Sequence, residues 1–379
     1  MLFKVSATPI FDLEQAPPEP SIAWRPILIG LILGLVFGAI LILEDENALP
    51  RWHCPFNGLL LLPALYVAIA FHEIGHCVVG KLVGLDAGGI SVGPFVFIKS
   101  GKNWVFRFDR RGWAGGFFKP LTVTVDFHPS RYAWLVAGGP IASILLTVLC
   151  GLICVRYGSG AWDWIGSLFW PSLFLAIISV IPFSSGLNKS DGARLWQLIR
   201  HPERARSWIA LLTLQTEDAN GLRPREWNPL PLEQILTVDA FANEYVYCQL
   251  MGFYRRLDED REAGALEHLE NALARSARVG KALRHGLFLE AASASAIIRK
   301  QAAQARSWRE RACKLRKPES LEVVEAGIAM CEGRYEEAAR HWEAARAHID
   351  RRRLDSGLIR FAKEKWEKYE AAGSVCDFV

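Results

Sequence analysis

The chain has 379 residues, of which 22% are charged, and its formal net charge is +4. This net charge is small and scattered along the chain, which excludes a nucleic-acid-binding surface. The eight cysteines form no Cys-x-x-Cys pair, which excludes a disulfide framework or a cysteine-based zinc site. The mean hydropathy is slightly positive. Since the long apolar runs precede residue 187 and most charges follow residue 188, we expect a membrane-embedded half followed by a water-soluble half.

Four segments approach the roughly 20 apolar residues that a helix needs to cross a bilayer. They are residues 23–43, 59–83, 132–155 and 164–182, the last of which is interrupted by Pro171. Residues 1–22 form a short segment before the first span. The sequence therefore predicts a polytopic membrane bundle of four helices in a mainly α-helical protein.

The distribution of lysine and arginine orients these spans, because loops rich in these residues stay in the cytoplasm. The loop between the second and third spans is basic; its cations are Lys99, Lys102, Arg107, Arg110, Arg111 and Lys119. The loop between the first two spans has three acids and one arginine, and the segment after the fourth span is again basic. We therefore expect both termini in the cytoplasm, in a bacterial inner membrane.

The second span carries His72, Glu73 and His76. On a helix, the spacing of four projects both imidazoles from one face, where two nitrogens reach one zinc ion. Glu73 then lies beside the ion without binding it and serves as a general base toward the attacking water. Such groups are costly in an apolar span and are seldom retained without a function. The alternative is a polar cluster that only bonds a neighbouring helix.

The loop after the second span has a strand-like pattern. Residues 90–98 and 104–108 are apolar and aromatic, and the turn sequence at 100–103 joins them. We expect a short β-hairpin at the membrane interface. It either offers a strand edge to an unwound substrate or serves packing alone.

A catalytic zinc ion has three protein ligands as a rule, so a third must come from elsewhere in the chain. The candidates at a matching depth are Asp191, Asp163, Asp126 and His128. Asp191 follows the fourth span at the cytoplasmic end, toward which His72 also lies, whereas the topology puts Asp163 on the opposite side. Asp191 has an alternative role as the N-cap of a helix over residues 192–199.

The C-terminal half is helical in pattern. Residues 200–235 contain four prolines and are expected to connect the membrane core of residues 23–199 to a cytoplasmic domain of residues 236–379. Segments 263–273, 301–313 and 333–345 look alike, and residues 333–338 are similar to the second helix of a tetratricopeptide repeat. We expect an α-solenoid whose concave face holds a cytoplasmic protein or peptide. The alternative is a helical bundle without a binding role.

Three separated motifs in residues 59–200 resemble the site-2 protease family of intramembrane zinc metalloproteases. They are Phe-His-Glu-Ile-Gly-His at 71–76, Ala-Gly-Gly-Pro-Ile-Ala-Ser at 137–143, and Ile-Pro at 181–182 followed by Asp-Gly at 191–192. The resemblance implies that His72, His76 and Asp191 bind one zinc ion and that Glu73 is the general base. It also implies hydrolysis of peptide bonds in or near the membrane span of a membrane-anchored protein.

The chain departs from the family pattern in the second and third motifs. Ser143 stands where the family has asparagine, and we expect it, with Gly139, to support the substrate or its oxyanion with a shorter reach. Ser179 replaces another asparagine, and the interval from Pro182 to Asp191 is longer than in the usual family form.

Two other functions remain open. The first is a catalytically inert membrane scaffold that recruits partners through its repeats, against which the intact His72, Glu73 and His76 set argues. The second is a different zinc hydrolase that takes its third ligand from a glutamate on a later helix, and no suitable glutamate occurs in such a context.

Overall fold

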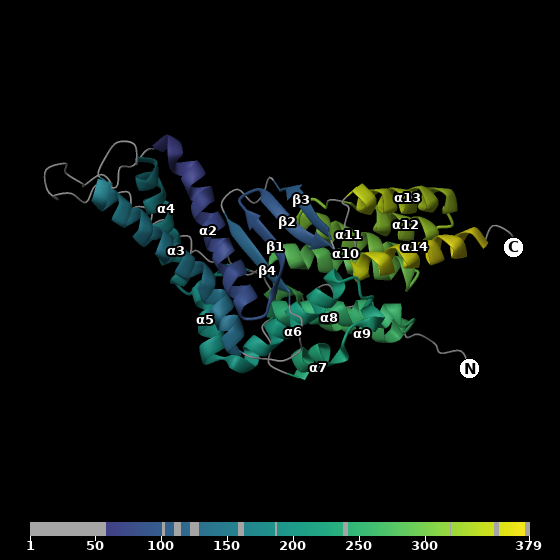
Figure 1. Cartoon of the computed structure of the whole chain (residues 1–379). Coiled ribbons are helices and arrows are strands. Elements are labelled where there is room, and N and C mark those ends of the chain that lie inside the picture. Colours follow the sequence, from purple (N-terminus) through teal and green to yellow (C-terminus); the bar gives the residue numbers. More distant parts are fainter. Residues whose placement is uncertain are drawn as a thin grey trace. The chain divides into compact units, whose positions relative to one another are not determined.

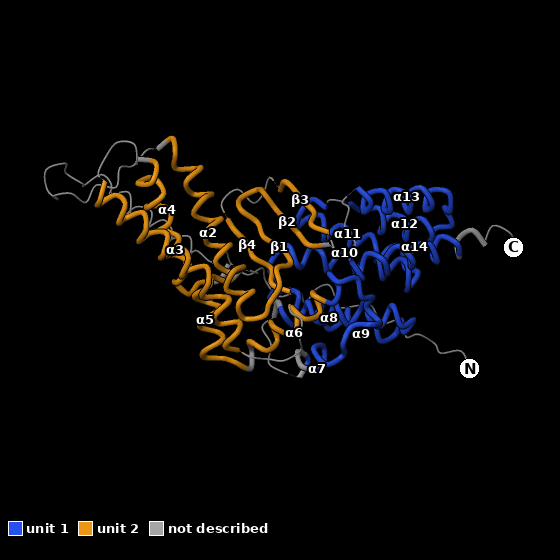
Figure 2. Tube along the Cα trace, in the orientation of Figure 1, with its two compact units in different colours: residues 1–20, 217–379 blue, residues 21–216 orange. Residues whose placement is uncertain are grey.

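The computed structural model describes residues 58–100, 103–109, 115–121, 129–157, 163–185, 188–237, 242–318, 320–351 and 356–375. Two compact units divide the chain: residues 21–216 form one, and residues 217–379 with 1–20 form the other (Figure 2). The first predicted span, residues 23–43, lies outside the described residues. The division falls inside helix α6 (Pro202–Ala219), so the predicted connection at 200–235 is largely helical.

Three apolar helices form the frame of the first unit (Figure 1). They are α2 (Leu61–Leu82), which follows the 3₁₀ turn η2 (Gly58–Leu60), α3 (Pro129–Tyr157) and α4 (Asp163–Val180). Their shared core consists of Ala64, Ala68, Leu146, Cys150, Cys154, Ile165 and Leu168. By length and composition α2 and α3 suffice to cross a membrane, and α4 is a shorter apolar helix. The four predicted spans are thus matched at the second and third, and the fourth coincides with the shorter helix.

The outward faces of α2 and α3 are apolar as well. The exposed side chains include Leu62, Phe71, Ile74 and Val78 on α2 and Ile144, Leu145, Val148, Leu149 and Leu152 on α3. A soluble protein rarely exposes so continuous an apolar surface to water, whereas hydrocarbon accommodates it without cost. These faces are therefore consistent with insertion of both helices into a membrane.

Glycines bring α2 and α3 into close contact. A Cβ atom on Gly75 would lie 2.4 Å from the carbonyl oxygen of Gly138, and one on Gly138 would lie 2.6 Å from that of Gly75. Small residues at a helix crossing allow the backbones to approach in this way. The face of α2 that carries the histidines is thereby pressed against α3.

The segment after α2 forms a four-stranded antiparallel sheet in the order β3-β2-β1-β4. Its strands are β1 (Asp86–Val92), β2 (Phe95–Ser100), β3 (Asn103–Phe108) and β4 (Gly116–Leu121). The prediction of one strand over 90–98 was wrong, because Gly93, with φ of +56°, and Pro94 turn the chain between β1 and β2. The predicted hairpin is thus the β2–β3 part of a larger sheet.

The last segment of the first unit packs against α3. Two-residue strands β5 (Ser184–Ser185) and β6 (Asn188–Lys189) pair with each other, and helix α5 (Asp191–Arg200) follows. Helices α5 and α6 contribute Leu198 and Ile209 to a core that includes Leu85, Tyr132 and Leu135. This core packs α5 and α6 against the first part of α3.

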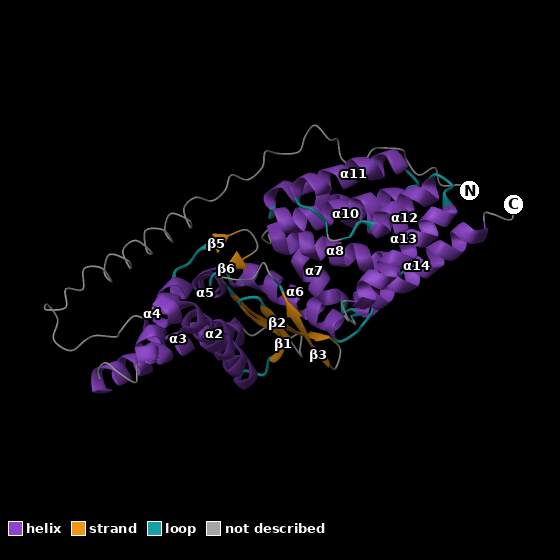
Figure 3. Cartoon of the chain, turned by 90° about the horizontal axis from the view of Figure 1, so that it is seen from above, coloured by secondary structure: helices purple, strands orange, loops and turns teal. Residues whose placement is uncertain are grey.

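The second unit is helical throughout its described residues (Figure 3). It begins with η3 (Pro224–Glu226) and α7 (Pro229–Thr237). Three successive helix pairs follow, α8 (Ala242–Asp258) with α9 (Glu262–Ala274), α10 (Lys281–Ile297) with α11 (Ala302–Leu315), and α12 (Glu322–Cys331) with α13 (Tyr335–Arg351). A short turn η4 (Ser276–Arg278) joins the first two pairs, and α14 (Gly357–Val375) ends the described chain.

Each pair is closed by the same kind of turn. Asp260, Lys300 and Gly333 have φ of +57°, +57° and +71°, and each lies two residues before the second helix of its pair. A left-handed residue at a helix C-terminus reverses the chain sharply. The three similar segments of the sequence lie on α9, α11 and α13, the second helices of the pairs.

Candidate metal centre

Helix α2 presents His72, Glu73 and His76 toward the interior of the first unit. All three are less than a tenth exposed, although they lie in an apolar helix. The imidazole rings of His72 and His76 stand edge to face with their centroids 4.9 Å apart. One helical turn separates them, so both point to the same side, as their spacing requires.

Asp191 joins these histidines from the first turn of α5. Its Oδ2 atom lies 3.0 Å from Nε2 of His72, and its Oδ1 atom lies 3.5 Å from Nε2 of His76. The ligand atoms of the three residues all lie within 4.8 Å of one another. Two ligands of one tetrahedral zinc ion are about 3.3 Å apart. The donor set and its spacing therefore fit a single zinc ion.

Asp191 is free for this role because a neighbour caps its helix. The hydroxyl of Ser190 accepts from the backbone N–H of Ala193 at 3.1 Å and donates to the carbonyl of Ile181 at 2.7 Å. The β5–β6 turn takes up the extra residues after Pro182 and returns the chain, so that Ser190 lies beside Phe183. The capping alternative for Asp191 was wrong, since Ser190 is the N-cap.

The residue after Asp191 must be small. A Cβ atom on Gly192 would lie 1.9 Å from the carbonyl oxygen of Val180, at the end of α4. Burial alone would raise the pKa of Asp191, but its hydrogen bonds with His72 and His76 outweigh burial and lower the pKa to about 2. The carboxylate is therefore ionised, which is the form that binds a metal ion.

Both histidines are oriented through their second ring nitrogen. Nδ1 of His72 lies 2.9 Å from the hydroxyl of Ser143, and Nδ1 of His76 donates to the carbonyl oxygen of Leu135 at 2.8 Å. A zinc ion at this centre would replace the Nε2 protons that face Asp191, and each ring would then keep its proton on Nδ1. Metal-binding histidines usually donate their other N–H in this way, and the partner sets the tautomer and the ring angle.

Glycines create the space around the centre. A Cβ atom on Gly139 would lie 2.3 Å from Nε2 of His76 and 2.6 Å from Nε2 of His72. A Cβ atom on Gly116, at the start of β4, would lie 2.2 Å from a carboxylate oxygen of Glu73. Helix α3 thus packs closely against His72 and His76 of α2, and strand β4 packs closely against Glu73.

The structure brings some of the site residues predicted from the sequence together and leaves other candidates apart. His72, Glu73, His76, Asp191, Ser143 and Gly139 lie together. Asp163 begins α4, the opposite end from the one that leads to Asp191, and Asp126 and His128 lie outside the described residues. Ser143 is 1% exposed and faces His72, so its hydroxyl is directed at a ligand.

Sequence reasoning missed three contributors: the carbonyl of Leu135, the cap at Ser190 and the glycine at Gly116. A serine directly before Asp-Gly at a helix start was a readable capping signal for Ser190. The other two carry no signal in the sequence, because one is a backbone oxygen and the other acts only through a contact between β4 and α2.

The chain matches the model of a known protein family. The model of peptidase family M50 matches residues 60–296. The match includes every residue of the centre and continues into the second unit as far as α10. No curated protein and no solved structure matches the chain.

Proposed function

The chain belongs to peptidase family M50, and we propose that it is an intramembrane zinc metalloprotease that cleaves a membrane-anchored protein in or near its membrane span. The observation that carries the proposal is the convergence of His72, His76 and Asp191 within 4.8 Å, on the inner side of apolar helices of spanning length. Three protein ligands leave a zinc ion one position open, which is the pattern of catalytic sites.

The residues divide the chemistry among them. His72, His76 and Asp191 hold the zinc ion, which when bound polarises the scissile carbonyl and activates water. Glu73 takes the proton of the attacking water and passes it to the leaving amine. Ser143 and the Leu135 carbonyl keep the imidazoles in the binding tautomer. Gly139 leaves room above the histidines.

Strand β4 is the proposed docking edge for the substrate. A membrane helix satisfies its own backbone, so a segment to be cut must unwind and find new partners. The hairpin expected at 90–108 contains the other edge of the sheet, β3, and the interior strands β2 and β1 separate that edge from β4. β4 is an edge strand and begins against Glu73. An extended substrate can add to it as a further strand.

The basic loops support the remaining proposals on topology. Four spans would place both termini in the cytoplasm of a bacterium, with the enzyme in the inner membrane. The second unit then faces the cytoplasm. Its three helix pairs support a tetratricopeptide-like role, in which they bind a cytoplasmic protein or peptide.

The test compares purified wild type and Glu73→Gln for zinc content and for cleavage of a membrane-anchored model substrate. Glutamine keeps the shape but cannot accept the proton, so cleavage should fall by about 10²–10⁴-fold while zinc stays bound. His72→Ala and Asp191→Ala should lose zinc itself. Equal cleavage by wild type and Glu73→Gln would leave the chain as a scaffold and end the protease proposal.

A further inference from the structure

Helix α14 joins the two ends of the second unit. At its beginning the backbone N–H of Leu358 donates to Oδ1 of Asp218 at 2.7 Å. Further along, Lys365 pairs with Asp260 at 2.5 Å, at the turn of the first helix pair. At the next residue, the ring of Trp366 lies 5.9 Å from that of Trp342 on the last pair. The helix therefore contacts both the turn of the first pair and the last pair, and its partners Asp218 and Asp260 lie more than a hundred residues earlier in the chain.

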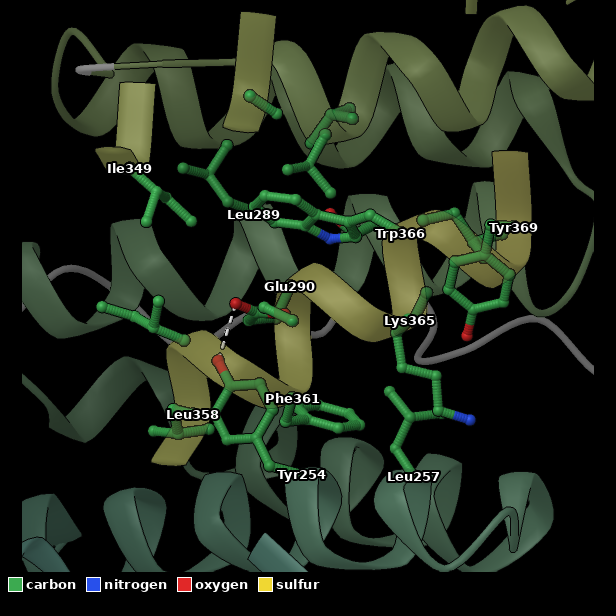
Figure 4. Close-up of a pocket in the computed structure, with 18 of the residues that line it drawn as sticks. Tyr254, Leu257, Leu289, Glu290, Ile349, Leu358, Phe361, Lys365, Trp366 and Tyr369 are labelled. Carbon is green, nitrogen blue, oxygen red and sulfur yellow. Dashed lines mark hydrogen bonds between the residues drawn. The ribbon is translucent and has the colours of Figure 1, made fainter. Parts of the chain in front are cut away.

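A cavity of about 390 Å³ lies between α14, the first helices of the pairs and the last part of α13 (Figure 4). Its apolar lining comes from α8, α10, α12, α13 and α14 and includes Leu257, Leu289, Ile297, Val324, Ile349, Phe361 and Trp366. Protein interiors pack tightly and leave few voids larger than one water molecule. A space of this volume falls within the range of ligand pockets. α14 thus covers this face without filling it.

The cavity wall carries one polar pair. The hydroxyl of Tyr254 on α8 donates to a carboxylate oxygen of Glu290 on α10 at 2.7 Å, and both side chains line the cavity (Figure 4). Burial raises the pKa of Glu290, and the hydrogen bond from Tyr254 offsets this only in part. The pair offers an acceptor oxygen to an occupant that brings an N–H or O–H donor.

The ion pairs at the middle of α14 each have one partner that water reaches. Asp260 is 72% exposed at its side chain, and Glu364, which pairs with Arg223, is 39% exposed. Ion pairs that water reaches contribute little to stability. A helix that is underpacked beneath and held by exposed ion pairs can be exchanged for another.

We propose that the face formed by α8, α10 and α12 is a groove for an amphipathic helix, and that α14 is its built-in occupant. The partner is a helix of a second protein with large aromatic and aliphatic residues on one face and a side-chain N–H donor opposite Glu290. It displaces α14 and fills the cavity better. This inference rests on the proposed partner-binding role of the second unit and not on the protease chemistry.

The test uses the full-length chain in lipid nanodiscs and a fluorescent synthetic peptide with the sequence of residues 357–375. In the wild type, α14 competes at an effective concentration on the order of millimolar, so the peptide binds weakly. Phe361→Ala with Trp366→Ala in the chain weakens α14 and leaves the groove helices unchanged. Fluorescence anisotropy should show at least about tenfold tighter binding to this variant. No binding to it would overturn the proposal.

Changes in the peptide control for adhesion to the nanodisc. A peptide with Phe361→Ala and Trp366→Ala should lose binding, whereas one with Glu367→Ala should bind as before, because Glu367 is exposed. Equal binding by all three peptides would count against a groove.

Hydrogen exchange on the wild type needs no variant. Amides of α14 should exchange at least about tenfold faster than those of α10, since exchange reports local opening. Equally slow exchange would make α14 a fixed part of the core and defeat the proposal. Neither measurement involves cleavage, so a failed groove is distinguishable from a failed protease.

Discussion

Helices α2 and α13 bury opposite kinds of residue. On α13, Ala338, Trp342 and Ala345 are buried and charged residues face outward. On α2, the buried set includes His72, Glu73 and His76, while Phe71 and Ile74 are exposed. Helix α13 follows the rule for water, where burial of apolar area drives packing. Helix α2 follows the rule for a bilayer, where outward apolar side chains cost nothing and an inward polar cluster is retained for function.

The largest expected effect tests whether side chains pack differently in the two units. Trp342→Ala removes a fully buried ring that contacts Trp366, and it should destabilise the second unit by about 3–5 kcal/mol. Leu145→Ala on the outward face of α3 leaves no cavity, because lipid fills the space, and should cost less than about 1 kcal/mol. Pulse proteolysis of the full chain in urea measures both. Similar losses would mean that Leu145 does not face lipid.

A charge on the outward faces sharpens the same contrast. Leu145→Arg places a guanidinium in hydrocarbon and should oppose membrane insertion by about 3 kcal/mol. Glu367→Arg on the exposed side of α14 should change stability by no more than about 0.5 kcal/mol. A membrane-integration assay measures the inserted fraction of Leu145→Arg, and urea unfolding measures the stability of Glu367→Arg. Normal insertion of Leu145→Arg would argue that water covers this face.

The inner face of the membrane unit can be probed through Ser143. Ser143→Ala removes the partner of His72 Nδ1 and should lower zinc affinity about 10–100-fold, measured by competition with a chelator. Ser172→Ala is the matched control, since this buried hydroxyl only donates to Leu168 on its own helix. If zinc affinity is unchanged but cleavage falls, Ser143 serves the oxyanion, as the family resemblance implied.

The smallest effect concerns a buried carboxyl in the second unit. Burial raises the folded-state pKa of Glu290, so the folded chain holds this proton more tightly than the unfolded chain does. The stabilisation is complete below the ordinary pKa and declines as pH rises toward the folded-state pKa. Glu290→Gln should remove that decline. Urea unfolding of the second unit across mildly acidic to neutral pH tests this, and parallel curves for the two proteins would contradict it.

The sequence predicted those features that depend on neighbours along one helix. The spacing of His72 and His76 needs only helical geometry, and the apolar runs at α2 and α3 need only their length. The sheet was partly missed although Gly93 and Pro94 mark its first turn, because an apolar strand pattern ran through both residues. The sequence identified those residues of the candidate site that lie in recognisable motifs.

Tertiary structure decided the rest. Asp191 lies 119 positions from His72, and its choice over a capping role depended on Ser190 and the β5–β6 turn. Ser143 was readable as a polar residue near Gly139, but its direction toward His72 follows from the glycine contact of α2 with α3. The cover that α14 makes over α8, α10 and α12 has no local signal either. Helical periodicity is encoded within a few residues, whereas the contacts between distant segments exist only once packing has brought them together.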